Sequence, residues 1–123
     1  MRIFKTRWFT KWAGKEGLTD KVLSAAIAEM ETGLIDADLG GNIYKKRVAR
    51  PGQGKSGSTR IIVAFKIGEK AFFMYGFAKN KMDNINDKEL EVFKIVGGDL
   101  LSYNGKQLET ALEKGELMEV INE

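Results

Sequence analysis

The amino-acid sequence predicts a single α+β domain spanning residues 1–123. Helical patterns dominate the first and last thirds of the chain, and three strand patterns lie between them. A length of 123 residues is typical of one domain, and 43% hydrophobic with 30% charged residues is a globular composition. We therefore expect helices and strands in separate blocks around a shared core.

The first residues predict a short strand at 1–6, followed by two helices. The first helical pattern covers residues 9–16, and Gly17 ends it because glycine readily adopts the left-handed conformation that closes helices. The second helix is bounded by Thr19, a good N-cap, and by Gly33, its expected C-cap. Its apolar side chains recur at helical spacing and are expected in the core: Leu23, Ala26, Ile27 and Met30.

Strand patterns follow at residues 42–50, 60–67 and 71–78, and the last two are rich in β-branched and aromatic side chains. Between these two, Gly68-Glu69 predicts a two-residue turn that pairs Ile67 with Lys70. The resulting register has three pairs that matter for the argument: Phe65 with Phe72, Ile62 with Tyr75, and Arg60 with Phe77.

This register divides the two strands into two different faces, because successive side chains of a strand point in opposite directions. One face carries Arg60, Tyr75 and Phe77, with Lys79 just beyond the strand. The other face is apolar and is expected to pack on helices: Ile61, Val63, Phe65, Phe72 and Met74. A slip of one residue in the register would exchange the two faces.

The C-terminal third returns to helical patterns. Capping boxes mark the start of two helices, at the pairs Asn86/Glu89 and Asn104/Gln107. The dipeptide Gly97-Gly98 is expected to weaken or break the first helix, and Gly115 to close the second. Residues 116–121 fit a strand and a helix equally well.

The chain contains no cysteine and no histidine, which limits its chemistry. Disulfides, thiolate catalysis and zinc sites built from Cys or His are excluded, and so is the usual general base at neutral pH. We expect no metal and no small-molecule cofactor. The longest apolar stretch, residues 71–78, is far shorter than the roughly 20 residues that span a bilayer. With no visible signal peptide, we expect a cytoplasmic protein without a membrane partner.

Two motifs suggest ligand sites but lack required residues. Gly54-Lys55-Ser56 matches the end of a phosphate-binding P-loop, yet Ala49 stands where that motif needs its first glycine. The acidic stretch at residues 36–40 has the beginning of a calcium loop, yet its twelfth position is Arg47 in place of glutamate. We expect Asp36 and Asp38 to be turn and capping residues.

Positive charge is concentrated in the middle of the chain. Residues 42–82 contain ten basic side chains and one acidic side chain, whereas residues 83–123 contain four and ten. Such a block is either a solvated surface or an anion-binding surface. Aromatic residues are interleaved with the cations, as in sites for single-stranded nucleic acid: the cations are Lys45, Lys46, Arg47, Arg50, Lys55, Arg60, Lys79 and Lys81, and the aromatics are Tyr44, Tyr75 and Phe77.

Three central segments, residues 45–57, 60–65 and 71–80, resemble the RelE-like toxin family of bacterial type II toxin–antitoxin systems, within the RelE/ParE superfamily. Residues 4–41 and 112–120 also resemble this family. The resemblance implies a small α+β fold, with N-terminal helices packed on a twisted antiparallel sheet and C-terminal helices after it. It further implies a ribosome-dependent endoribonuclease that cleaves mRNA and is neutralised by a cognate antitoxin protein.

The resemblance also implies a basic active surface on this chain, formed by Lys45, Arg47, Arg50, Lys55, Arg60 and Lys79. Arg60 matches best, because superfamily members often carry an arginine just before the corresponding strand. We assign Lys46 and Lys81 to the RNA-binding set together with Lys45, Arg47 and Arg50. Some related ribonucleases use a histidine or a near-terminal aromatic in proton transfer; this chain has no histidine, and its last aromatic is Tyr103.

RNA is cleaved when a 2′-OH attacks the adjacent phosphate in line, which requires alignment, charge stabilisation and proton transfer. Arg60, with Arg50 or Arg47, is expected to stabilise the developing charge. Lys79 or Lys55 is expected to do the same or to deprotonate the 2′-OH, and Tyr75 to donate a proton or stack on a base. Two alternatives stay open: a ParE-like inhibitor of DNA gyrase, and a non-catalytic nucleic-acid-binding module.

Overall fold

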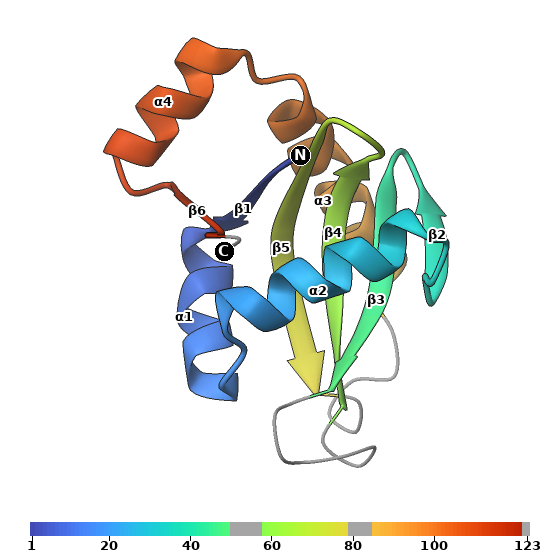
Figure 1. Ribbon diagram of the computed structural model, residues 1–123. Coiled ribbons are helices and arrows are strands. Elements are labelled where there is room, and N and C mark those ends of the chain that lie inside the picture. Colours follow the sequence, from blue (N-terminus) through green and yellow to red (C-terminus); the bar gives the residue numbers. More distant parts are fainter. Residues whose placement is uncertain (50–57, 79–84, 122–123) are drawn as a thin grey trace.

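A computed structural model describes residues 1–49, 58–78 and 85–121, which form an α+β fold of four helices and a six-stranded sheet (Figure 1). The helices are α1 (Arg7–Glu16), α2 (Asp20–Glu31), α3 (Asp87–Leu101) and α4 (Gly105–Glu113). The strands are β1 (Arg2–Thr6), β2 (Ala37–Gly40), β3 (Ile43–Ala49), β4 (Ser58–Lys66), β5 (Lys70–Ala78) and β6 (Leu117–Glu119). The predicted α+β class is confirmed.

The sheet has the strand order β2-β3-β4-β5-β1-β6 (Figure 1). Its pairs are antiparallel except for β1 and β5, which run parallel. The expectation of an antiparallel sheet is therefore wrong at this point, and the sheet is mixed. The physical reason is the connection between the two strands: a long stretch of chain that includes α1 and α2 separates β1 from β5, so no hairpin forces them to run antiparallel.

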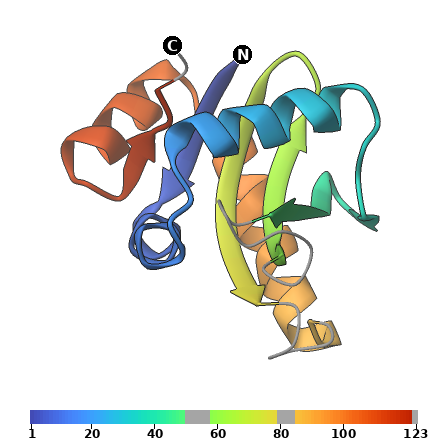
Figure 2. The ribbon, with the colours of Figure 1, turned by 60° about the horizontal axis from the view of Figure 1, so that its bottom comes forward.

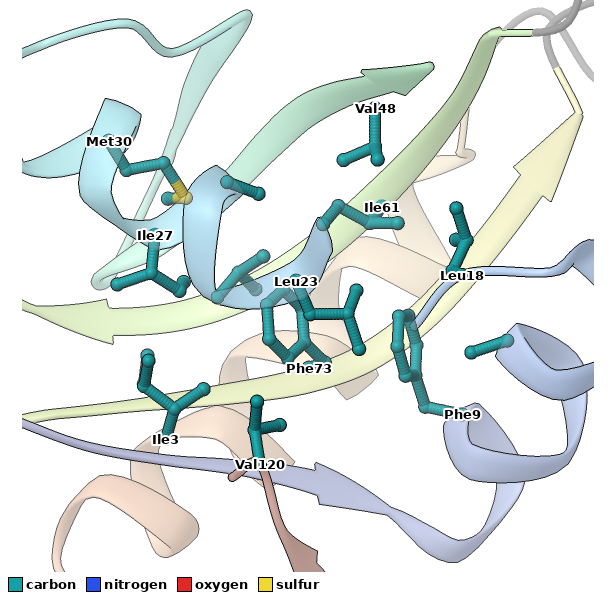
Figure 3. Close-up of a cluster of buried hydrophobic side chains, with 14 of the residues drawn as sticks. Ile3, Phe9, Leu18, Leu23, Ile27, Met30, Val48, Ile61, Phe73 and Val120 are labelled. Atoms are coloured by element: carbon teal, nitrogen blue, oxygen red, sulfur yellow. The ribbon is translucent and has the colours of Figure 1, made fainter. Parts of the chain in front are cut away.

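Helices cover both faces of this sheet (Figure 2). On one face, Leu23 and Ile27 of α2 pack with Ile61 and Phe73 of the central strands (Figure 3). On the other face, α3 packs over β4 and β5, and the second buried cluster includes Phe72 and other apolar residues. The predicted stripe on α2 is confirmed as core, since each of its four residues is buried.

The β4–β5 hairpin has a three-residue connection in place of the predicted two-residue turn. Lys66 is paired with Lys70, the amide of Glu69 donates to the carbonyl of Lys66, and Gly68 has a φ of 77°. The left-handed conformation explains why a glycine stands at this position. The prediction that Ile67 pairs with Lys70 is therefore wrong by one residue.

A β-bulge restores the register further along the hairpin. Between the pairs Ile62/Tyr75 and Val63/Phe73, Met74 is the extra residue on β5. The two displacements cancel, so the predicted pairs of Ile62 with Tyr75 and Arg60 with Phe77 are confirmed. Between the turn and the bulge the predicted register is wrong, because Phe65 pairs with Ala71 and not with Phe72. The predicted face is wrong there too: Phe72 and Met74 belong to the cluster that faces α3, whereas Phe65 belongs to the cluster on the α2 side.

Local end signals predicted the helices well. Both capping boxes are present, at Asn86/Glu89 and Asn104/Gln107, Thr19 caps α2, and Gly17 closes α1 with a φ of 73°. Helix α2 has its C-cap at Thr32, one residue before the predicted Gly33. The ambiguous residues 116–121 contain the short strand β6.

The expected break at Gly97-Gly98 does not occur, because α3 continues through both glycines to Leu101. Gly97 is buried, and a Cβ atom placed there would lie 2.4 Å from Cδ1 of Ile43. The glycine therefore lets α3 approach the sheet closely. Nothing lies within 4 Å of the corresponding position on Gly98.

Candidate nucleic-acid interface

Three strands place part of the predicted basic surface on one face of the sheet. Arg47 of β3 is paired with Arg60 of β4, which is paired in turn with Phe77 of β5. Lys45 and Tyr75 are both paired with Ile62 in the same way. Because directly opposed residues project from the same side of a sheet, these side chains share the face on which α3 packs.

Arg60 is held in place by an ion pair. Its Nε lies 2.9 Å from Oδ2 of Asp36, and only 13% of the arginine side chain is exposed. Its Nη1 is buried and has no hydrogen-bond partner in the described part of the chain. A buried donor without a partner is uncommon and unfavourable. The arrangement thus fixes one edge of the guanidinium and leaves Nη1 unsatisfied, so an acceptor such as a phosphate oxygen would satisfy it once the atoms that cover it move aside.

Asp36 was expected to be a turn or capping residue, and the structure gives it an additional role. It directly precedes β2, and its amide donates to the carbonyl of Lys45 across the β2–β3 pair. This backbone bond fixes the carboxylate near Arg60. The β2 strand was not predicted, and no local pattern in the sequence links Asp36 to Arg60, 24 positions away.

Tyr75 lies at the centre of an aromatic cluster, in which it stacks on Trp8 and makes tilted contacts with Phe93 and Phe77. Its ring centroid is 4.6 Å from that of Trp8 in α1, 5.4 Å from Phe93 in α3 and 6.3 Å from Phe77. Trp8 is 47% exposed. Sequence analysis missed Trp8, although it lies among basic residues at positions 5, 7 and 11, the same interleaving of cations and aromatics that singled out residues 42–82.

Lys46 lies on the opposite face from Arg60. Its side chain is buried, and its Nζ lies 2.8 Å from Oε1 of Glu29 in α2. This position anchors α2 to β3. Arg47, by contrast, is exposed on the face of Arg60, and at the edge of β3 it also borders, with Ala49, two adjacent surface pockets of about 410 and 200 Å³ on the α2 side.

Four predicted cations lie outside the described residues: Arg50, Lys55, Lys79 and Lys81. The Gly54-Lys55-Ser56 motif lies there too. The described strand ends next to them are aligned, since Ala49 is paired with Ser58, and Ala78 with Thr59. In the sequence, Arg50 directly follows Ala49 and Lys79 directly follows Ala78.

Two carboxyl groups with altered pKa values lie at the other side of the molecule. Burial acts to raise the pKa of Asp20, but hydrogen bonds from Lys5 and from the amide of Ile121 outweigh it and lower that pKa. The Arg2 guanidinium lowers the pKa of Glu119 across the β1–β6 pair and has its own pKa raised. These contacts hold the C-terminal strand in place.

Two other kinds of feature are absent from residues 1–49, 58–78 and 85–121. No helix there is long and apolar enough to cross a membrane. No group of three or more His, Cys, Asp or Glu side chains there is arranged to hold a metal ion.

Comparison with known protein families agrees with the resemblance of the central segments. The family model described as the RelE toxin of the RelE/RelB toxin–antitoxin system matches residues 1–120. A search of curated proteins returned no match. The family match includes every helix and strand described above, together with the whole basic segment. This chain therefore belongs to the RelE toxin family, whose members act as toxins paired with an antitoxin protein.

Proposed function

We propose that this toxin is an endoribonuclease that cleaves mRNA on the ribosome in the cytoplasm, and that its cognate antitoxin neutralises it. The observation that carries the proposal is the state of Arg60: its Nε is paired with Asp36, while its buried Nη1 has no partner among the described residues. A guanidinium fixed in this way is suited to bind a phosphate whose charge increases during cleavage.

The reaction proposed is an attack of the RNA 2′-OH on the adjacent phosphorus. The 2′ oxygen forms a bond to phosphorus, the bond from phosphorus to the 5′ oxygen breaks, and the products end in a 2′,3′-cyclic phosphate and a 5′-OH. The 2′ proton passes to a base, and the leaving 5′ oxygen receives a proton. This route needs no metal ion, and the ribosome supplies part of the alignment.

The roles of individual residues follow from placement and from the family resemblance. Arg60 contacts the reacting phosphate, and the exposed Arg47 on the neighbouring strand binds a flanking phosphate together with Lys45. Tyr75, within the aromatic cluster, stacks on a base or donates the proton to the leaving group. Lys55 and Lys79 are assigned to charge stabilisation or proton transfer, and Arg50 and Lys81 to RNA binding, by resemblance alone.

The proposal is tested with purified toxin and ribosomes programmed with a defined mRNA. We expect new mRNA ends at the position of the ribosome, with 2′,3′-cyclic phosphate and 5′-OH termini, and no cleavage after the antitoxin is added. Intact mRNA combined with inhibited DNA supercoiling by gyrase would contradict the proposal and favour the ParE-like alternative. Ribosome binding without cleavage would instead indicate a non-catalytic module.

A further inference from the structure

The edge of β5 changes its neighbour halfway along the strand. β1 is paired with β5 only from Lys70 to Phe73, and the following part of β5 is flanked by α1. Trp12 of α1 lies over Gly76, whose backbone is close enough that a Cβ atom would lie 2.2 Å from the indole. One helical turn earlier, Trp8 stacks on the Tyr75 ring at 4.6 Å with an interplanar angle of 24°.

The two tryptophans of the chain have different surroundings. Trp12 is half-buried and packs against the core cluster on the α2 side of the sheet. Trp8 is 47% exposed, even though an indole is among the largest apolar groups a protein can bury. Its ring nevertheless stacks on Tyr75, which Phe93 contacts from α3, and it also lies nearly parallel to the Trp12 ring, with 6.2 Å between the two centroids. Trp8 therefore presents a rigid aromatic surface to solvent.

Cations lie beside this surface on the same helix. Lys11 and Lys15 follow Trp8 by three and seven positions, so they lie on the same side of α1, and both are exposed. On the other side of Trp8, Tyr75 contacts Phe77 two residues further along β5, and Phe77 is paired with Arg60 on the neighbouring strand β4. An exposed ring flanked by cations is the pattern that single-stranded nucleic acid requires, because bases stack on the ring and phosphates meet the charges.

We infer that Trp8 is a stacking platform for a base of the RNA strand, and that Lys11 and Lys15 contact its neighbouring phosphates. This inference rests on the proposed function and extends it, because it adds α1 to an interface that the sequence placed within residues 44–81. A protein partner would also contact an exposed indole. RNA is favoured because the aromatic cluster joins Trp8 to the face that carries Arg60 and Arg47.

The experiment uses the fact that the chain contains only two tryptophans. In Trp12→Phe the fluorescence reports on Trp8 alone, and in Trp8→Phe it reports on Trp12 alone. Each variant is titrated with a short single-stranded RNA and with the same RNA carrying abasic sites. We expect the intact RNA to quench Trp8 strongly and the abasic RNA to quench it little, and we expect Trp12, whose ring centroid lies 6.2 Å from that of Trp8, to be quenched less than Trp8.

Affinity and cleavage are measured in parallel. Trp8→Ala is expected to weaken RNA binding by about 5-fold to 150-fold, the loss typical of one stacked base, and Trp8→Phe to weaken it less. Ile67→Ala is the matched control, since Ile67 is 68% exposed in the β4–β5 connection, away from α1, and should change nothing. Circular dichroism establishes that each variant is folded.

The outcomes separate this inference from the proposed function. If the wild-type protein cleaves mRNA on ribosomes while Trp8→Ala binds RNA with unchanged affinity and Trp8 is not quenched, the stacking role is refuted and the ribonuclease proposal stands. If the antitoxin perturbs Trp8 fluorescence and RNA does not, the exposed indole is a protein interface and the inference is also refuted. If the wild-type protein neither binds RNA nor cleaves mRNA, the proposed function fails together with the inference that rests on it.

Discussion

Replacing Gly76 with alanine should destabilise the protein through a single steric contact. The new Cβ atom would lie 2.2 and 2.3 Å from two ring atoms of Trp12, whereas carbon atoms in contact prefer about 3.5–4.0 Å. The indole must therefore move by more than about 1 Å. Overpacking of this kind costs about 1–3 kcal/mol. The backbone of Gly76 does not have a positive φ, so alanine itself is compatible with the strand.

The backbone preference of alanine over glycine opposes this steric cost, and its magnitude is also known. Alanine in the middle of a strand is more favourable than glycine by about 0.5–1 kcal/mol, because the unfolded chain loses less freedom on folding. We expect a net loss of about 1–2 kcal/mol for Gly76→Ala, which lowers the Tm by about 3–10 °C in a domain of this size.

A double-mutant cycle isolates the contact between the two residues. Urea unfolding, followed by circular dichroism, is measured for the wild type, Gly76→Ala, Trp12→Ala and the double variant. Trp12→Ala removes the three atoms nearest to the added methyl group, so Gly76→Ala should stabilise the Trp12→Ala protein by about 0.5–1 kcal/mol. An equal effect of Gly76→Ala in both backgrounds would refute the reasoning that α1 is packed directly on the β5 backbone.

Three further predictions concern α3, the C-terminal strand and RNA binding. Gly98→Ala should raise the Tm by a few degrees, because its Cβ enters open space and alanine favours the helix by about 1 kcal/mol. Gly97→Ala should lower the Tm through the contact with Ile43, and equal Tm shifts for the two variants would contradict this. The lowered pKa values of Asp20 and Glu119 mean that their contribution to stability is complete above about pH 5 and disappears as the pH falls through those values; unfolding free energies that stay constant down to about pH 2 would refute it. The affinity for single-stranded RNA should fall with salt with a log–log slope of about −0.7 per phosphate contact, and a flat response in a salt titration would show that the basic segment is only a solvated surface.

The parts of the fold that depend on neighbouring residues were readable in the sequence. The capping boxes at Asn86 and Asn104 depend on contacts three residues apart, and the apolar stripe of α2 depends on helical spacing. The hairpin shows the limit of such reasoning. The predicted pairing of Arg60 with Phe77 is correct only because two deviations from the predicted hairpin compensate each other: an extra residue in the turn and the bulge at Met74.

Features that join distant segments could not be read from the sequence. The parallel pairing of β1 with β5 connects residues almost 70 positions apart, and the ion pair of Asp36 with Arg60 depends on a strand with only four residues. The stack of Trp8 on Tyr75 requires α1 to occupy the edge of β5 that β1 leaves free. In each case a tertiary arrangement, which has no local pattern, determines the contact.

The central claim is that Arg60 stabilises the charge that develops on the phosphate during cleavage. Its most direct test is the single-turnover rate of mRNA cleavage on programmed ribosomes, with ribosome binding measured in parallel. Arg60→Ala should reduce the rate by about 10²–10³-fold, the loss typical of one transition-state donor, and Arg60→Lys should recover only part of it. Lys66→Ala, an exposed basic residue at the other end of β4, is the control and should cleave normally. Full cleavage by a folded Arg60→Ala protein would contradict the claim, and lost ribosome binding with an unchanged single-turnover rate would assign Arg60 to docking.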